Sequence, residues 1–181
     1  YADLYENAPD MYATVDPEDA TILQCNQTLA DKLGFLKTEI IGRPVFDMYH
    51  RDCMDDANAA FESFQNTGVV KNAELILRRK DGGRIDVILN VVAVRDEAGD
   101  IIQSRSAWRD ISELKAMQRE LVASELKYEG VVTAMYEGMV HQAADGAIIS
   151  CNPAAELILG LTRDQMAGRT STDPRWRTIH E

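Results

Sequence analysis

A stretch of 22 residues occurs twice in the chain, and this duplication constrains the fold more than any other feature. The segment ILQCNQTLADKLGFLKTEIIGR (residues 22–43) aligns without a gap on IISCNPAAELILGLTRDQMAGR (residues 148–169), at a constant offset of 126 residues. Residues that recur include Ile22, Cys25, Asn26, Gly34, Gly42 and Arg43. A period this long indicates a duplicated domain rather than a solenoid repeat.

The shared residues predict the same local structure in both copies. A short apolar strand ends at Asn26 or Asn152, whose side chain can cap the helix that follows. Gly34 and Gly160 then end that helix, because glycine adopts the left-handed conformation at a helix C-terminus without a steric penalty. We expect each copy to be a strand, a capped helix, a glycine stop and a second short helix. We expect the recurring cysteine at the strand end to be a small buried thiol.

The residues around the first copy predict five strands and a long helix. Two short strands, MYATV and ILQC, flank a Pro-Glu-Asp turn, and three more strands follow, joined by turns at residues 80–83 and 96–100. Met54, Ala57, Phe61 and Phe64 have the three-four spacing of an apolar helix stripe that ends at Gly68. These elements predict an α+β fold, in which a five-stranded antiparallel sheet carries helices on one face.

Four phrases in this order resemble the PAS domain family. They are C-N at the end of the second strand, L-G-(x)7-G-R (residues 33–43), R-R-K-D-G-G (78–83) and W-R-D-I-S-E-L (108–114). The resemblance implies a first PAS domain at residues 1–112 and a helical connector at 113–125, with the helix extending to about residue 136. Residues 126–181 resemble the front half of a second PAS domain, and D-P-R-W-R-T-I-H-E (173–181) corresponds to the point before its last three strands. We therefore expect a truncated second unit and a chain that is part of a longer protein.

The resemblance also implies a pocket between the cupped sheet and the helices. Strand alternation places Ile85, Val87, Leu89 and Val91 on one face, and Ile102, Ser104, Ser106 and Trp108 on one face of the last strand. The candidate ligand-binding residues are Phe61, Phe64, Leu75, Leu77, Leu89, Ser104, Ser106 and Trp108. The alternative is that Trp108 fills the space and that the serine hydroxyls bond to the backbone.

Known PAS cofactors can be compared with individual residues. Haem-binding members resembling oxygen sensors carry a histidine on the long helix, here 54–67, which contains none; His50 lies just before it. Light-sensing flavin members carry a reactive cysteine in an Asn-Cys-Arg phrase, where this chain has Gly42-Arg43-Pro44 and only the nearby, off-pattern Cys53. We expect neither haem nor a light-sensing flavin adduct, and the resemblance leaves the cofactor unknown.

The end of the first domain is the candidate output side. Asp110-Ile-Ser-Glu113 has the form of a capping box that begins a long helix, on which Leu114, Met117 and Leu121 start a weak heptad seam. In PAS proteins such a helix relays the signal, so these five residues are the candidate relay. The outer face of the sheet carries the apolar side chains of Ile88, Val92 and Val94, which would be unusual on a solvent-exposed face. We therefore expect the N-terminal helix, the connector or a second subunit to cover this face.

Composition limits the functional classes. The net charge of −11 argues against nucleic-acid binding, which needs clustered Lys and Arg. No apolar run reaches the roughly 20 residues of a membrane span, and no catalytic motif or metal-ligand cluster appears. Within these limits, the resemblance to PAS domains implies a cytoplasmic, non-enzymatic homodimeric sensor of a small ligand or redox cue, coupled to an effector such as a histidine kinase or a diguanylate cyclase. The alternative is a dimerisation scaffold without a ligand.

Overall fold

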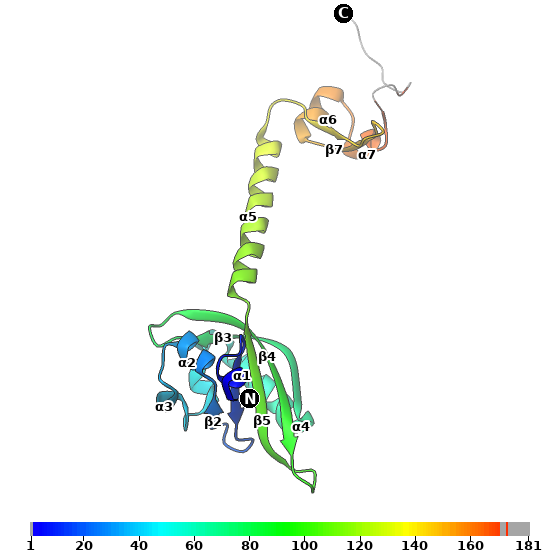
Figure 1. Ribbon diagram of the computed structural model, residues 1–181. Coiled ribbons are helices and arrows are strands. Elements are labelled where there is room, and N and C mark those ends of the chain that lie inside the picture. Colours follow the sequence, from blue (N-terminus) through cyan, green and yellow to red (C-terminus); the bar gives the residue numbers. More distant parts are fainter. Residues whose placement is uncertain (1, 171–172, 174–181) are drawn as a thin grey trace, which may run out of the picture. The chain divides into compact units, whose positions relative to one another are not determined.

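The computed structural model describes residues 2–170 and residue 173, which fall into two compact units that divide between Met117 and Gln118. The first unit contains the expected five-stranded antiparallel sheet, in the order β2-β1-β5-β4-β3 (Figure 1). The strands are β1 (Met11–Val15), β2 (Ile22–Cys25), β3 (Val69–Arg78), β4 (Arg84–Arg95) and β5 (Ile101–Asp110). The last strand of the unit is therefore central in the sheet, because β5 pairs with both β1 and β4.

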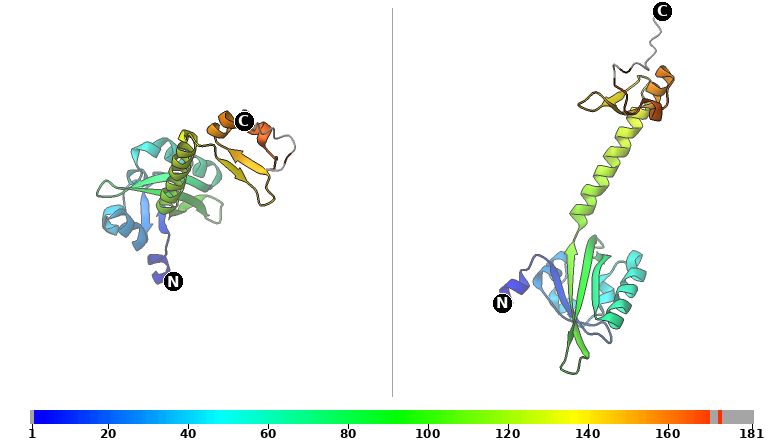
Figure 2. Two further views of the ribbon diagram at one scale, coloured as in Figure 1. Left: turned by 90° about the horizontal axis from the view of Figure 1, so that it is seen from above. Right: turned by 90° about the vertical axis from the view of Figure 1, so that its right-hand side faces the viewer.

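The helices of the first unit come mainly from the segment between β2 and β3. They are α2 (Gln27–Leu33), α3 (Lys37–Ile40), the 3-10 helices η1 (Val45–Met48) and η2 (Arg51–Cys53), and α4 (Met54–Thr67). Their buried apolar side chains join those of the inner sheet face in one core, so they cover the same face of the sheet, as the sequence predicted. The short helix α1 (Ala2–Glu6) precedes the sheet, and the strands lie between α1 and α4 (Figure 2).

Burial along the strands follows the predicted alternation with one exception. Val87, Leu89 and Val91 are buried as expected, but Ile102 is 52% exposed and does not share the inner face with Ser104. The cause is a shift in register, because Val94 pairs with Gln103 whereas Arg95 pairs with Ile101. This irregularity skips Ile102, and the preceding Ile101 packs against the core in its place.

The N-terminal helix packs against only the β1 side of the outer sheet face. Tyr5 of α1 stacks on Tyr12 with ring centroids 6.1 Å apart, and Glu6 pairs with Lys37 at 2.7 Å. These contacts hold α1 beside β1 and α3. Val92 on the outer face stays 50% exposed, so α1 covers only part of this face and leaves Val92 open.

The two copies of the repeat have the same local structure. In the second unit, β6 (Val140–Gln142) pairs with β7 (Ile148–Cys151), and α6 (Pro153–Leu159) and α7 (Arg163–Met166) follow. Gly34 and Gly160 end α2 and α6 at φ values of 76° and 65°, the left-handed region that glycine tolerates. The segment 173–181, on which the expected truncation depends, lies outside the described residues apart from Asp173.

The asparagine shared by both copies has a larger role than a cap. Asn26 accepts hydrogen bonds from the N–H groups of Leu29 and Tyr12, and its amide donates to the carbonyls of Tyr5 and Asp10. Asn152 makes the same four bonds in the second unit, with Ala155, Met139, Val132 and Glu137. Each amide therefore joins a helix N-terminus, a strand hairpin and the helix that precedes this hairpin.

The connector helix α5 spans Ser112–Ala134, so it runs on past residue 125 and ends close to the expected residue 136. The predicted capping box at its start was wrong. Asp110 still pairs with Val87 as the last residue of β5, and its carboxylate accepts from the backbone N–H of Ser112. Within the described residues the Glu113 carboxylate accepts no hydrogen bond from the backbone N–H of Asp110, and Glu113 is exposed. Because the strand continues through Asp110, the helix begins too late for the box to form.

Candidate functional site

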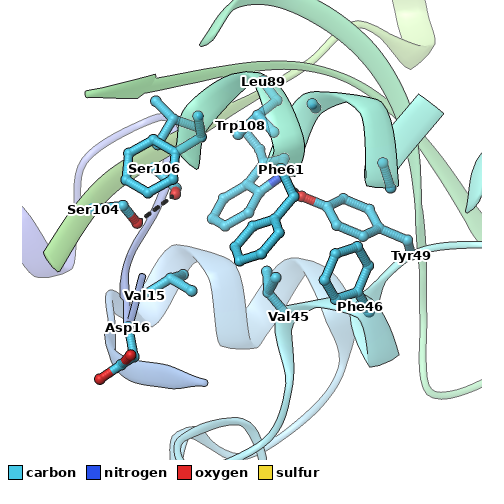
Figure 3. A pocket seen from close by; sticks show the side chains of 14 residues that line it. Val15, Asp16, Val45, Phe46, Tyr49, Phe61, Leu89, Ser104, Ser106 and Trp108 are labelled. Carbon is cyan, nitrogen blue, oxygen red and sulfur yellow. Dashed lines mark hydrogen bonds between the residues drawn. The ribbon is translucent and has the colours of Figure 1, made fainter. Parts of the chain in front are cut away.

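A cavity lies between the inner face of the sheet and the helices η1 and α4 (Figure 3). Its empty volume is about 410 Å³, which includes the part open to solvent. Strands β1, β4 and β5 contribute one wall, and the segment from residue 45 to residue 64 contributes the other. The lining residues are Val15, Asp16, Val45, Phe46, Tyr49, Ala57, Ala60, Phe61, Phe64, Leu89, Val91, Ser104, Ser106 and Trp108.

Six of the eight predicted ligand-binding residues line this cavity: Phe61, Phe64, Leu89, Ser104, Ser106 and Trp108. Leu75 and Leu77 are buried but lie outside the lining. They belong to the edge strand β3, and the backbone of Tyr49 forms a bridge with Leu77. The chain around Tyr49 therefore runs along the free edge of β3, and the cavity is lined by the strands β1, β4 and β5 instead.

Sequence reasoning missed the lining residues that the connecting segments supply. Val91 and Ala57 follow the alternation and helix spacing already recognised, and they could have been included. Phe46 and Tyr49 lie in and after η1, where a short 3-10 turn gives no apolar period to follow. Asp16 lies in the turn between β1 and β2, and nothing in the sequence indicates that this turn reaches the cavity.

Trp108 and Tyr49 are joined by a hydrogen bond at one end of the cavity. The indole Nε1 of Trp108 donates to the hydroxyl oxygen of Tyr49 at 3.2 Å. Burial raises the pKa of Tyr49, and the smaller opposing effect of the bond from Trp108 does not reverse this, so the phenol is neutral. Phe46 packs edge to face with Tyr49 and with Phe61, at centroid distances of 6.3 and 5.5 Å. The aromatic side chains thus form a connected wall.

Ser104 and Ser106 lie at the other end of the inner face of β5. Both side chains are buried, and their Oγ atoms are 3.4 Å apart in a mutual hydrogen bond. This bond differs from the expected alternative, in which the hydroxyls bond to the backbone. Val15 is the cross-strand partner of Ser104, and Asp16 follows Val15. The carboxylate of Asp16 points away from the two serine hydroxyls (Figure 3).

The residues considered for cofactor attachment lie outside this cavity. The Nδ1 atom of His50 accepts from the backbone N–H of Asp52 at 3.2 Å. The thiol of Cys53 accepts from the N–H of Ile76 at 3.2 Å, so it completes the hydrogen bonding of β3. Neither residue lines the cavity. Among the described residues, no group of three or more His, Cys, Asp and Glu could hold a metal ion.

The strand that lines the cavity ends in a cluster of polar contacts. The carboxylate of Asp110 pairs with Lys32 of α2 at 2.6 Å and accepts from Ser112. Burial raises the pKa of Asp110, but the hydrogen bonds from Lys32 and Ser112 outweigh it and lower the pKa overall. Ile111 donates to the carbonyl of Asp86, whose N–H donates to Ser112 Oγ at 3.0 Å. The start of α5 is thereby attached to α2 and β4.

The other candidate relay residues lie on the surface of α5. Leu114, Met117 and Leu121 are each more than half exposed. No residue of α5 is buried. In the described part of the chain, every helix is too short or too polar to cross a bilayer.

Comparison with known proteins gives one family. A family model described as "PAS domain" matches residues 9–113, and a second model with the same description matches residues 126–180. The first match alone spans more than half of the chain. No curated protein matches the sequence closely enough to count as a relative.

Solved structures share the fold. The PAS domain of an HTR-like protein from Haloarcula marismortui is 26% identical, with a TM-score of 0.52, over 61% of this chain and 88% of that one. A PAS domain from Colwellia psychrerythraea is 19% identical, with a TM-score of 0.56, over 62% of this chain and 94% of that one. An RNA-binding light-oxygen-voltage receptor is 19% identical, with a TM-score of 0.58, over 66% of this chain but only 35% of that one. At 19% identity these likenesses show the fold alone.

Proposed function

The chain belongs to the PAS domain family, whose members are sensory and signalling modules, and from this premise we propose that its first unit senses a small ligand and relays the signal through α5. One observation carries the proposal. Ser104, Ser106 and Trp108 line the cavity from β5, and the same strand ends at Asp110, two residues before α5 begins. A ligand that moves this strand acts directly on the start of the helix.

The contacts around Asp110 connect a movement of β5 to the start of α5. The start of α5 is held by the Lys32–Asp110 pair and by the exchange of bonds between Asp86, Ile111 and Ser112. A displacement of β5 relative to α2 or β4 changes these bonds before it changes anything else in the helix. In this proposal Asp110 acts as the relay between cavity and connector, whereas Glu113 lies exposed on the first turn of α5.

The effector, the cellular location and the absence of catalysis are part of the same proposal. The effector is a histidine kinase or a diguanylate cyclase fused to this region or partnered with it, and the sensor acts in the cytoplasm without catalysing a reaction. Haem and a light-sensing flavin adduct are not invoked, because His50 and Cys53 lie outside the cavity lining. The prediction against nucleic acid rests on the charge of −11 alone, and an RNA-binding receptor is among the structural neighbours.

A ligand-free dimerisation scaffold is the second candidate. The side chains of Leu114, Met117 and Leu121 favour it, because they follow the spacing of a coiled-coil seam and are each more than half exposed. A homodimer through this seam is compatible with both candidates. The two differ in whether the cavity influences the helix.

A pair of leucine variants on β5 tests the difference. Ser106→Leu places a larger side chain in the cavity, and Arg105→Leu makes a similar change at the adjacent, exposed position. We expect Ser106→Leu to change hydrogen exchange of the amides of residues 112–118 by at least fivefold, about 1 kcal/mol of local stability. Arg105→Leu should leave these amides unchanged.

Native mass spectrometry of the purified chain provides the second measurement. A co-purified small molecule that is lost in Ser106→Leu but kept in Arg105→Leu supports the sensor. Circular dichroism controls for folding, and Ala60→Leu fills the cavity from α4 if Ser106→Leu does not fold. Unchanged exchange in both cavity variants, together with the absence of any bound molecule, favours the scaffold.

A further inference from the structure

Two buried hydroxyl groups lie in an otherwise apolar part of the cavity wall. Ser104 and Ser106 are 3% and 6% exposed, and both line the cavity from β5. Their cross-strand partners on β1 and β4 are all apolar: Val15 and Ala93 for Ser104, and Ala13 and Val91 for Ser106. Within the described sheet, the neighbouring strands therefore place no polar side chain directly beside either hydroxyl.

The hydrogen bond between the two serines leaves much of their capacity unused. Their Oγ atoms are 3.4 Å apart, whereas an O–H···O bond is usually about 2.7–2.8 Å long (Figure 3). Each hydroxyl has one proton to donate and two lone pairs that accept, and this long bond uses one proton and one lone pair. Within the described residues, no other hydrogen bond engages either Oγ. Because buried hydroxyls are unfavourable without partners, we expect a partner to come from the cavity.

A single oxygen atom placed between the serines can satisfy both hydroxyls. Two donors that are 3.4 Å apart can each approach one acceptor to about 2.8 Å, because an atom at the apex of that triangle lies within ordinary hydrogen-bond length of both. A carbonyl oxygen has two lone pairs, so it can accept from both hydroxyl protons at once. One long bond is then exchanged for two short ones.

The lining favours an uncharged occupant. Among the described residues it contains no Lys, Arg or His, so an anion would find no cation beside the hydroxyl pair. Asp16 is the only acidic residue of this described lining, and its carboxylate points away from the serines (Figure 3). A cation at the hydroxyl pair would therefore lack a counter-ion as well. Because charges buried without a partner are costly, carboxylates, phosphates and amines fit this position poorly.

Aromatic side chains form the wall next to the hydroxyl pair. Trp108 follows Ser106 by two residues on the same face of β5, so its indole is the neighbour of the pair along the strand. Phe61 of α4 and Phe46 of η1 line the same cavity and pack edge to face on one another. Such rings bind a further aromatic ring through offset or edge contacts. The indole N–H of Trp108 already donates to Tyr49, so it does not compete with the serines for a ligand oxygen.

We propose that the first unit binds an uncharged aromatic aldehyde or ketone. Its carbonyl oxygen accepts from the hydroxyls of Ser104 and Ser106, and its ring packs against Trp108 and Phe61. This inference rests on the proposed sensor function and names the ligand class. Binding acts on the relay through the strand itself, because both serines belong to β5, which ends at Asp110.

Four probes with one phenyl ring separate the effect of the carbonyl from that of charge. They are acetophenone, ethylbenzene, benzoate and 1-phenylethylammonium, which carry a ketone, an ethyl group, a carboxylate and an ammonium group. In isothermal titration calorimetry on the whole chain, acetophenone should bind, and the two charged probes should bind at least tenfold more weakly because no counter-ion awaits them. Ethylbenzene lacks the oxygen, so its affinity is the reference for apolar packing alone.

Serine-to-alanine variants locate the hydrogen bonds. Ser104→Ala and Ser106→Ala each remove one donor and should weaken acetophenone about fivefold, as expected for one net hydrogen bond. Ethylbenzene should bind these variants at least as tightly as it binds the unchanged chain. Ser63→Ala is the matched control, because Ser63 is exposed on α4, and it should change neither affinity.

Infrared spectra of acetophenone labelled with carbon-13 at its carbonyl provide a readout that does not depend on affinity. Hydrogen bonds weaken the carbonyl bond, so its stretch should move to lower wavenumber in the unchanged chain and less far in each serine variant. The same stretch in all of them would show that the serines do not hold the oxygen, and the inference would be overturned. Circular dichroism checks that the variants are folded.

The remaining outcomes separate this inference from the proposed function. The inference is overturned if acetophenone does not bind, if a charged probe binds more tightly, or if the serine variants weaken ethylbenzene as much as acetophenone. In those cases the sensor proposal stands only if Ser106→Leu still changes hydrogen exchange at residues 112–118. If acetophenone does not bind and the cavity variants leave this exchange unchanged, both proposals fall.

Discussion

Replacing Asn26 with alanine should destabilise the first unit more than any other single truncation of a polar side chain discussed above. Asn26 is fully buried, and its side-chain oxygen and nitrogen use all four of their hydrogen-bonding positions. Alanine leaves two N–H groups and two carbonyls of the backbone without these partners. It also separates the hairpin of β1 and β2 from α1 and from the start of α2.

The magnitude follows from the bonds. At about 1 kcal/mol for each net hydrogen bond, the loss is about 4 kcal/mol, and stranded buried donors add to it. Native domains have only about 5–15 kcal/mol of stability, so the variant should be close to unfolding. Gln24→Ala is the matched control, because Gln24 is exposed on the same hairpin and should cost less than about 0.5 kcal/mol.

Urea unfolding followed by tryptophan fluorescence measures this change. The chain has two tryptophans, so a Trp176→Phe background leaves the buried Trp108 as the reporter of the first unit. Hydrogen exchange at the Tyr12 and Leu29 amides reports the loss of their acceptor directly. A loss below about 1 kcal/mol, or one no larger than that of Gln24→Ala, would refute the view that this amide organises the unit.

Three further changes test individual contacts. Tyr49→Phe should lower the free energy of unfolding by about 1–2 kcal/mol in urea, because the buried Trp108 indole loses its acceptor. In a Trp108→Phe background this loss should nearly vanish. An undiminished loss would contradict the hydrogen bond between the two side chains. Cys53→Ala should lower the free energy of unfolding by about 1 kcal/mol and speed hydrogen exchange of the Ile76 amide, which donates to the thiol. Unchanged exchange of this amide would show that the bond is not formed. The lowered pKa of Asp110 contributes stability that is present above its unfolded value of about 3.9 and is lost as pH falls through the lower folded value. Lys32→Met should raise the Asp110 pKa in a carbon-13 NMR titration and reduce this acid-dependent loss, and an unchanged pKa would rule out the ion pair as a cause.

The local structure of the repeat could be predicted because each residue acts on its immediate neighbours. A capping asparagine and a glycine with positive φ work through bonds within a few residues, so sequence spacing is sufficient evidence. The other bonds of Asn26 could not be predicted in this way. They reach Tyr5 and Asp10, whose positions depend on how α1 and β1 fold back onto α2.

The cavity was predictable where the backbone is regular and not elsewhere. Alternation along β5 identified Ser104, Ser106 and Trp108, because a paired strand keeps its two faces separate. The same rule failed at Ile102, where the register shift reverses the facing direction. The rule makes no prediction for Phe46 or Tyr49, because a short 3-10 turn has no extended apolar period.

The duplicated asparagine also bears on how a signal can leave α5. Val132 of α5 accepts from Asn152 as Tyr5 of α1 accepts from Asn26, so the final turns of α5 hold the place in the second unit that α1 holds in the first. The start of α5 is bonded to β4 through Ile111. Both ends of the connector are therefore hydrogen-bonded to neighbouring strands or turns, and in the proposed relay the bond from Asn152 to Val132 is the contact through which the end of α5 would act.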